Sequence, residues 1–194
     1  VFAMPADLTR PDEVTRLVSA VTDHLGGIDI LVNNAGMTQV NGDEPSGPLQ
    51  SMTDAAWDYG IDINLKTAFL ATRAVLPGMR EAGSGLIINI SSIAGKRALE
   101  LAGAAYCAGK FAMTALGMAA GLEERHRGIR ITNIYPGEVN TPILEQRPEP
   151  VPQERREQML QPEDLAEIVL SIVRLPPRVH VWEVAVTPLY QPYA

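Results

Sequence analysis

The sequence predicts an α/β protein built on a parallel β-sheet with helices on both faces. Short apolar segments alternate with longer segments whose apolar residues recur at helical spacing, a rhythm typical of repeated strand–helix–strand units. The apolar segments show little polar alternation, as expected for strands buried on both faces. Polar or glycine-containing turns follow these segments, at the sheet edge where doubly wound proteins bind ligands. We therefore predict a doubly wound parallel sheet in a single domain spanning residues 1–194.

The first predicted helix carries start and stop signals. Thr9 and Asp12 match a capping box, and Pro11 falls in the first helical turn. Apolar residues then repeat at helical spacing as far as Leu25, which a Gly-Gly pair follows. The pattern predicts a helix that ends at this pair.

The other elements follow from apolar runs and the turn residues between them. A Gly-, Pro- and Ser-rich stretch at 37–51 predicts a loop, and the Pro-rich segment 147–156 predicts another loop inside the domain. Pro77 lies near the end of the longest predicted helix. The predicted strands cover 1–6, 28–32, 86–90, 129–135 and 179–186, and the predicted helices beyond the first cover about 53–76, 104–126 and 162–175.

The composition is that of an ordinary globular protein. Hydrophobic residues make up 46% of the chain and charged residues 20%, and no apolar run reaches the roughly 20 residues of a membrane span. The net charge of −7 argues against nucleic-acid binding, which needs a basic surface. One cysteine, Cys107, excludes an internal disulfide framework, and the three histidines are scattered rather than spaced as metal ligands. We expect a cytoplasmic protein without a metal site.

Tyr106 and Lys110 form the sharpest chemical pair in the chain. Four residues apart on a predicted helix, they share one face. A tyrosine has a pKa of about 10, too high for acid–base work near neutrality, and a neighbouring ammonium favours the phenolate and lowers that pKa. Ser92, at the end of the preceding strand, can reach the same space and hold a substrate oxygen. Each feature is usually structural when it occurs alone.

Five motifs that occur in one order give this pair its meaning. The chain resembles the single-domain branch of the short-chain dehydrogenase/reductase family, and the likeness spans nearly its whole length. The resemblance implies a Rossmann-like domain that interconverts a secondary alcohol and a ketone by hydride transfer with NAD or NADP. The motifs are NNAG at 33–36, Asn64 within INL, NISS at 89–92, YCAGK at 106–110 and PGEVNT at 136–141.

The resemblance implies catalytic roles for four residues. Ser92 would orient the substrate oxygen, and Tyr106 would exchange a proton with it. Lys110 would lower the tyrosine pKa and hydrogen-bond the nicotinamide ribose, and Asn64 would anchor a water in a proton relay ending at this lysine. Other residues would hold the cofactor. Asp7 and Leu8 would flank the adenine, and Asn34, Ala35 and Gly36 would lie along the adenosine ribose. The turn of Pro136, Gly137, Val139 and Thr141 would bind the nicotinamide end, with Val139 and Thr141 at its carboxamide.

Two departures from the family pattern stand out. Gly109 occupies a position where the family more often has serine, but it lies off the face shared by Tyr106 and Lys110, so we expect no loss of chemistry. The opening strand, the glycine-rich phosphate-binding turn and the second strand that selects the cofactor have no match in the chain. We expect that roughly 50 residues, two strand–helix units, are missing upstream, and that the chain as given binds cofactor poorly.

The C-terminal part bears on the substrate. The ending LPPRVHVWEVAVTP resembles the branch that acts on 3-hydroxy acids and small hydroxy amino acids, and an acyl-carrier or sugar alcohol substrate stays open as the alternative. The segment that matches the family's substrate-covering loop, 142–160, carries Arg147, Arg155 and Arg156; an acidic substrate is one interpretation, and a solvated charged loop is the more common one. The resemblance also implies a homodimer or homotetramer formed through the two long helices.

Two alternatives from other classes stay open. One alternative to an enzyme is a catalytically silent binding or regulatory module, or an inactive fragment. The joint retention of Ser92, Tyr106, Lys110 and Asn64 argues against the silent module. Epimerase and dehydratase relatives share the tyrosine–lysine spacing, but the NNAG turn, the position of Asn64 and the short C-terminal part argue against them.

Overall fold

The computed structural model describes residues 1–38, 49–147 and 149–192. The four strands within these ranges form one parallel sheet in the order β1-β2-β3-β4. The connections between them contain helices, as crossovers between parallel strands require. The predicted fold class is confirmed. The strands are β1 (Ile30–Asn33), β2 (Gly85–Ile90), β3 (Ile129–Pro136) and β4 (Glu183–Val186).

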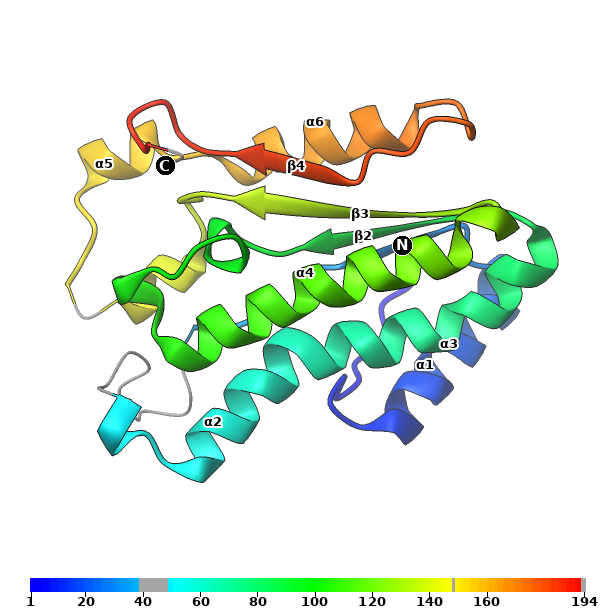
Figure 1. Cartoon of the computed structure of the whole chain (residues 1–194), viewed down its shortest axis with the longest axis horizontal. Coiled ribbons are helices and arrows are strands. Elements are labelled where there is room, and N and C mark those ends of the chain that lie inside the picture. The colour runs from blue at the N-terminus through cyan, green and yellow to red at the C-terminus, as the bar shows by residue number, and fades with distance from the viewer. Residues whose placement is uncertain (39–48, 148, 193–194) are drawn as a thin grey trace.

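Helices cover both faces of this sheet (Figure 1). Successive residues of β2 alternate between two cores, because side chains along a strand point to opposite faces. Ile87 packs in the core beneath α3, whereas Leu86 and Ile88 pack in the core beneath α6. The helices on the first face are α1 (Pro11–Leu25), α3 (Thr67–Ala82) and α4 (Ala104–Glu124), and the helix on the second is α6 (Pro162–Val173).

One long helical stretch runs beside α4 (Figure 1). It consists of α2 (Asp54–Ile61), a π-helical segment (Asp62–Lys66) and α3 in direct succession. Thr53 begins it, and its hydroxyl accepts a hydrogen bond from Ala56 N at 3.1 Å, the usual N-terminal cap. The sequence predicted this helix but not its π-helical interruption.

The predicted end of this helix at Leu76 is wrong. Pro77 lies inside α3, although it has no N–H to donate to the preceding turn. The helix continues because Val75 and Met79, on either side of the proline, are buried in the core. It ends before Gly83, which takes the left-handed φ of 66° that terminates many helices.

The N-terminal segment departs from two predictions. Residues 1–6 pair with none of the described strands, so the strand predicted there is wrong. The predicted capping box is also wrong, because Arg10 is the residue that precedes the first helical turn. Thr9 instead binds Asp7: the Thr9 hydroxyl donates to Asp7 Oδ1 at 2.7 Å, and the Thr9 backbone N–H donates to the same oxygen at 2.9 Å.

The last strand is shorter than the predicted 179–186 and begins only at Glu183. Nε2 of His180 lies 3.1 Å from the N atom and 2.8 Å from the O atom of Ile131, so a side chain occupies the place where strand backbone would pair. The hydroxyl of Thr132 donates to Val181 O at 2.6 Å. Side-chain contacts therefore stand in place of the ladder at residues 180 and 181, and backbone pairing resumes where the N–H of Asn133 donates to Trp182 O at 3.0 Å.

The loop predicted at 147–156 contains the start of a short helix, α5 (Gln153–Gln158). Glu154 lies in its first turn, and Arg155 and Arg156 lie in its last turn, which matches the helix dipole. Most of the loop predicted at 37–51 falls on 39–48, outside the described residues. Across the residues described we find no helix with the length and apolar content that a bilayer crossing requires.

A row of buried asparagines crosses the sheet at one register. Asn33, Asn89 and Asn133 are aligned on β1, β2 and β3. Nδ2 of Asn33 donates to Oδ1 of Asn89 at 2.9 Å, and Nδ2 of Asn89 donates to Oδ1 of Asn133 at 2.9 Å. Thr72 of α3 accepts a further bond from Asn33 at 3.2 Å. A Cβ at Gly117 of α4 would lie 2.2 Å from Asn133 Oδ1, so this glycine lets the helix approach the row.

Candidate active site

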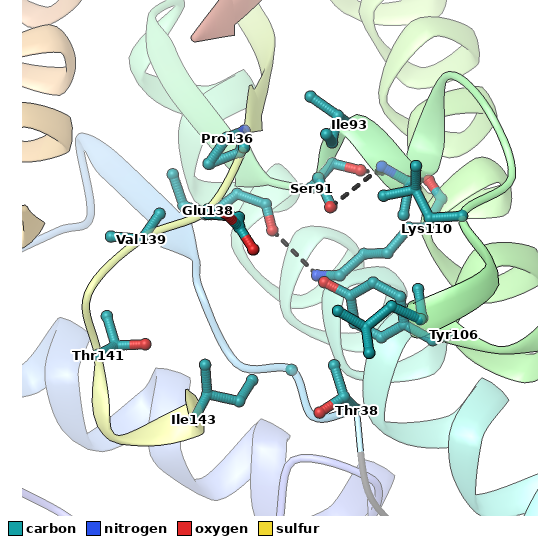
Figure 2. Close-up of a pocket in the computed structure, with 18 of the residues that line it drawn as sticks. Thr38, Ser91, Ile93, Tyr106, Lys110, Pro136, Glu138, Val139, Thr141 and Ile143 are labelled. Atoms are coloured by element: carbon teal, nitrogen blue, oxygen red, sulfur yellow. Dashed lines mark hydrogen bonds between the residues drawn. The ribbon is translucent and has the colours of Figure 1, made fainter. Parts of the chain in front are cut away.

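A cavity of about 670 Å³ opens at the carboxyl ends of the strands, the edge where ligands bind in doubly wound sheets. Its size suits a small-molecule ligand. Figure 2 shows Tyr106 and Lys110 on one side of the cavity and Val139, Thr141 and Ile143 on the other. Its lining comes from the ends of three strands, from α4 and α6, and from the C-terminal segment; among it are Asn34, Gly36, Ser92, Tyr106, Lys110, Pro136, Gly137, Glu138, Val139, Thr141, Arg147, Leu165 and Gln191.

Helix α4 presents Tyr106 and Lys110 to this cavity one turn apart. Lys110 is 3% exposed. Its Nζ donates to Ile90 O, at the end of β2, at 3.1 Å and lies 5.6 Å from the centroid of the Tyr106 ring. The ammonium is therefore tied to the sheet edge and close to the tyrosine ring.

The two side chains have pKa values shifted by burial. Burial raises the pKa of the Tyr106 phenol above its usual value, and a hydrogen bond with the Ser92 side chain offsets part of this rise. Burial lowers the pKa of Lys110 to about 8. The lowering of the tyrosine pKa by Lys110 stays a prediction; the net shift in this structure is upward, because burial disfavours the charged phenolate.

Ser92 stands at the end of β2 and caps a single turn of 3₁₀ helix, Ile93–Gly95. Its hydroxyl oxygen accepts a hydrogen bond from Ala94 N at 3.1 Å. A hydroxyl that accepts in this way keeps its own proton for donation to another oxygen. The structure thus brings Ser92 and Tyr106 to the same cavity, as the motif order predicted.

The burial of Lys110 makes a stability prediction. Lys110→Met is expected to be more stable than the wild type at pH 7, with a free energy of unfolding about 1–3 kcal/mol higher. The substitution removes a buried ammonium and loses the hydrogen bond to Ile90 O. The folded pKa of about 8 lies below the unfolded value of about 10.4, so the penalty on the wild type is full below pH 8 and fades as pH rises toward 10.4.

Urea unfolding at pH 7 and pH 10 measures this difference. The advantage of Lys110→Met should shrink at the higher pH. Lys66→Met is the control, since Lys66 is partly exposed and its ion pair with Asp62 lies at the surface. A Lys110→Met protein that is less stable than the wild type at pH 7 contradicts the assigned penalty.

Asn64 lies beside Lys110 rather than on the cavity wall. It sits in the π-helical segment and is completely buried. Its Nδ2 donates to Gly60 O at 3.0 Å and to Met37 O at 2.8 Å, and its Oδ1 accepts from Met37 N at 3.2 Å. In a regular α-helix Gly60 O would accept from the backbone N–H of Asn64. The side chain takes over this acceptor in the π-helical turn, a feature frequent at functional sites.

Two glycines let these groups converge. A Cβ at Gly36 would lie 3.0 Å from Asn64 Oδ1 and 3.1 Å from Lys110 Nζ. A Cβ at Gly109 would lie 2.9 Å from the Cβ of Asn64. Gly109, a departure from the family pattern, is therefore a contact between α4 and the π-helical segment, and a serine there would have to displace Asn64.

Nine of the residues singled out from the motifs line the cavity, and four do not. Asp7, Leu8 and Ala35 lie outside it, and Asn64 lies behind Gly36. Asp7 is exposed, and hydrogen bonds from Thr9 lower the pKa of its carboxyl group. Those that line the cavity are Asn34, Gly36, Ser92, Tyr106, Lys110, Pro136, Gly137, Val139 and Thr141.

A charged cluster at the cavity was not predicted as a unit. Glu138 Oε1 pairs with Arg147 at 3.0 Å, and its Oε2 pairs with Arg155 at 2.9 Å and accepts from the Tyr190 hydroxyl at 2.6 Å. Burial alone would raise the pKa of Glu138, but the bonds from Tyr190, Arg155 and Arg147 together lower it. Gln191 also binds here, its Oε1 accepting from Glu138 N at 2.9 Å.

The segment that carries Arg147 and Arg155 is anchored where it leaves and where it rejoins the turn after β3. It leaves the turn after β3 and returns to it at Leu160, whose N–H donates to Glu138 O at 3.1 Å and whose O accepts from Asn140 N at 2.8 Å. The sequence signalled this cluster only through an unusual concentration of arginine and glutamate at 138–156. Nothing in it indicated that Tyr190 and Gln191 would join.

Comparison with known proteins identifies the family. The short chain dehydrogenase family model matches residues 1–151. A 3-alpha-(or 20-beta)-hydroxysteroid dehydrogenase of Mycobacterium bovis is 36% identical over 170 residues, which are 86% of this chain and 61% of that protein. A D-beta-hydroxybutyrate dehydrogenase of Rhizobium meliloti is 36% identical over 147 residues, which are 76% of this chain and 54% of that protein.

Solved structures agree with the sequence relatives. A metagenomic short-chain oxidoreductase in complex with NADP superposes with a TM-score of 0.79 and 32% sequence identity, over 98% of this chain and 75% of that one. The chain thus spans only part of the length of each relative. Its sheet, its motif order and its matched sequence all agree, and the chain belongs to the short-chain dehydrogenase family.

Proposed function

We propose that the protein is an NAD- or NADP-dependent oxidoreductase that interconverts a secondary alcohol and a ketone. One observation carries the proposal: Ser92, Tyr106 and Lys110 converge on one cavity at the carboxyl edge of the sheet. The names of the relatives support it, since they are dehydrogenases of a hydroxysteroid and of hydroxybutyrate. Three donors of this kind suit a reaction in which charge develops on one oxygen.

The residues around the cavity fit the nicotinamide end of the cofactor. The turn at Gly137 approaches the C-terminal segment so closely that a Cβ would lie 2.3 Å from Gln191 Oε1, and Val139 and Thr141 beyond it line the cavity. These two would hold the carboxamide, and Lys110 would bind the ribose. We keep Asp7, Leu8, Asn34 and Ala35 as proposed contacts of the adenosine half. When bound, the nicotinamide supplies or accepts the hydride at the carbon bearing the oxygen.

The chain's own residues handle the proton. A tyrosine with its usual pKa of about 10 is neutral at pH 7, and burial raises the pKa of Tyr106 further, so in ketone reduction its hydroxyl donates a proton to the substrate oxygen. The Ser92 hydroxyl donates a hydrogen bond to the same oxygen and fixes its position. Lys110 stabilises the phenolate that remains, and Asn64, packed beside Lys110 and Gly36, is the proposed anchor of the water that restores the proton.

A spectrophotometric assay tests the function. The protein at its natural length should reduce NAD or NADP in the presence of secondary alcohols, with 3-hydroxy acids and small hydroxy amino acids as proposed substrates. Absorbance of the reduced nicotinamide is the readout, and the two cofactors are compared in parallel. A protein that binds cofactor but turns over no alcohol or ketone would be the silent module, and this result would reject the proposal.

We also propose a homodimer or homotetramer that buries the faces of the long helices. The helical stretch of α2 and α3 runs beside α4 (Figure 1), and all three helices expose large apolar side chains. Exposed apolar side chains that gather on neighbouring elements are a common sign of association. The cytoplasmic location expected from the sequence remains part of the proposal. The exposed residues are Trp57, Phe69, Phe111, Met118 and Leu122.

Substitution on this face tests the assembly. Phe111→Glu is expected to convert an oligomer to a monomer, because a carboxylate would be buried at the contact without a partner. Light scattering after size-exclusion chromatography measures the mass. Leu25→Glu, at an exposed apolar residue at the end of α1, is the matched control and should leave the mass unchanged. An unchanged mass in Phe111→Glu would count against this interface.

A further inference from the structure

Arg147 brings a cation into the cavity that holds Tyr106. It follows the short 3₁₀ helix Pro142–Gln146, and its backbone N–H donates to Leu144 O at 3.2 Å. Its side chain is 23% exposed and lines the cavity together with Tyr106. It belongs to neither the proton-handling group nor the residues proposed to hold the cofactor.

The charges around Arg147 do not cancel. One carboxylate, Glu138, stands between two guanidinium groups, because Arg155 pairs with its other oxygen. The Tyr190 hydroxyl fills a further acceptor position on Glu138. The group of three charged side chains therefore carries one surplus positive charge. Only Arg147 of the two arginines lines the cavity, since Arg155 is 54% exposed and lies outside it.

The pairing also fixes the position of Arg147. Glu138 follows directly on the Pro-Gly turn and its side chain is 12% exposed, so it provides a stiff support. An arginine has five N–H donors in a planar fork, and one ion pair leaves donors free for a second carboxylate. The other charged side chains of the lining are Lys110, which binds Ile90 O, and Glu100, which is exposed to solvent.

Apolar side chains line the same cavity as Arg147. Val139, Ile143, Leu144 and Leu165 all contribute to it. A short carbon skeleton would pack against these side chains, with its oxygen at Tyr106 and an anionic end at the guanidinium. Such a ligand has an apolar centre and two polar ends, and the lining offers apolar side chains together with Tyr106 and Arg147.

We propose that Arg147 is the specificity-determining residue of this site and binds the carboxylate of a short hydroxy or oxo acid, with Glu138 as its positioning residue. The inference rests on the proposed oxidoreductase function and assigns its substrate class to a named residue. Bidentate pairing with a carboxylate is the recognition for which a guanidinium is best shaped. The acid is therefore favoured over a neutral alcohol of the same skeleton.

A matched pair of substrates tests the proposal. The kcat/KM for 3-hydroxybutyrate is compared with that for its methyl ester, which keeps the skeleton and removes the charge. Arg147→Gln should lower kcat/KM for the acid about 10- to 100-fold, mainly through KM, and change that for the ester by no more than about twofold. Arg147→Lys should recover part of the loss. Arg155→Gln removes the other partner of Glu138 and should leave the acid-to-ester ratio unchanged.

Equilibrium binding separates this inference from the proposed function. Calorimetric titration with 3-hydroxybutyrate, in the presence of the reduced cofactor, which cannot accept its hydride, should show weaker binding to Arg147→Gln than to the wild type, whereas Arg155→Gln should bind as the wild type does. A protein with no turnover of any alcohol would reject the oxidoreductase function, and the binding comparison would still decide the role of Arg147. An acid-to-ester ratio and an acid affinity that are the same in Arg147→Gln and the wild type overturn the proposal.

Discussion

Tyr106→Phe is expected to lower turnover by about 10²- to 10⁴-fold, the contribution of a positioned proton donor. The substitution removes one oxygen and keeps the ring that lines the cavity. Ser92 and Lys110 keep their own contacts to Ala94 N and Ile90 O, so the site should otherwise hold its shape. The loss should therefore appear in kcat, while cofactor affinity changes little.

Steady-state kinetics and cofactor titration of the same preparation measure these two quantities. Tyr59→Phe is the matched control: among the described residues its hydroxyl bonds to Met37 Sδ, at 3.5 Å, and Tyr59 is not part of the cavity lining. A raised pKa of Tyr106 adds a pH signature, because alcohol oxidation needs the phenolate and should accelerate as pH rises. Turnover by Tyr106→Phe within a few-fold of the wild type would refute the assigned role.

Asn89→Leu is expected to lower the free energy of unfolding by about 2–6 kcal/mol. Asn89 is 2% exposed and is the middle member of the asparagine row across the sheet. Leucine would leave an amide donor of Asn33 and the Oδ1 of Asn133 buried without the partner they now have. Each such group costs about 1–3 kcal/mol. Gly117 packs tightly on the Asn89 side chain, since a Cβ built on this glycine would lie 2.6 Å from Asn89 Nδ2. The branched leucine side chain would therefore also press on Gly117.

Urea unfolding followed by circular dichroism measures this loss. Asn34→Ala is the control, because Asn34 follows Asn33 of the row but is itself exposed and outside it, and the substitution should cost less than about 0.5 kcal/mol. A loss below about 1 kcal/mol for Asn89→Leu would show that water or rearranged side chains satisfy the row without its central amide.

The sheet edge was predictable because it follows from local patterns. Buried strands of four to eight residues stand out in the sequence, and parallel strands place their carboxyl ends at one edge. Ser92 and the Pro136 turn therefore had to meet near Tyr106, whatever the details of packing. The strand at 1–6 failed for the opposite reason, since an apolar run becomes a strand only where a neighbour is available to pair with it.

Features that depend on tertiary packing were beyond the sequence. The direction of the Tyr106 pKa shift is set by how much protein surrounds the phenol, and the spacing to Lys110 alone suggested the opposite sign. The π-helical turn at Asn64 depends on a side chain that competes for a backbone carbonyl. The cluster on Glu138 joins Arg147, Arg155 and Tyr190 from irregular or short helical segments, which carry no periodic signal.

Transfer of an isotope tests the central claim, that this site moves a hydride between a substrate carbon and a nicotinamide. The protein at its natural length is mixed with the oxidised cofactor and a secondary alcohol deuterated at the carbon bearing the hydroxyl, and the reduced cofactor is examined by proton NMR. We predict deuterium at C4 of the nicotinamide with the wild type and, in the same time, almost none with Tyr106→Phe. Deuterium recovered in water while the nicotinamide stays unlabelled or unreduced would contradict the account.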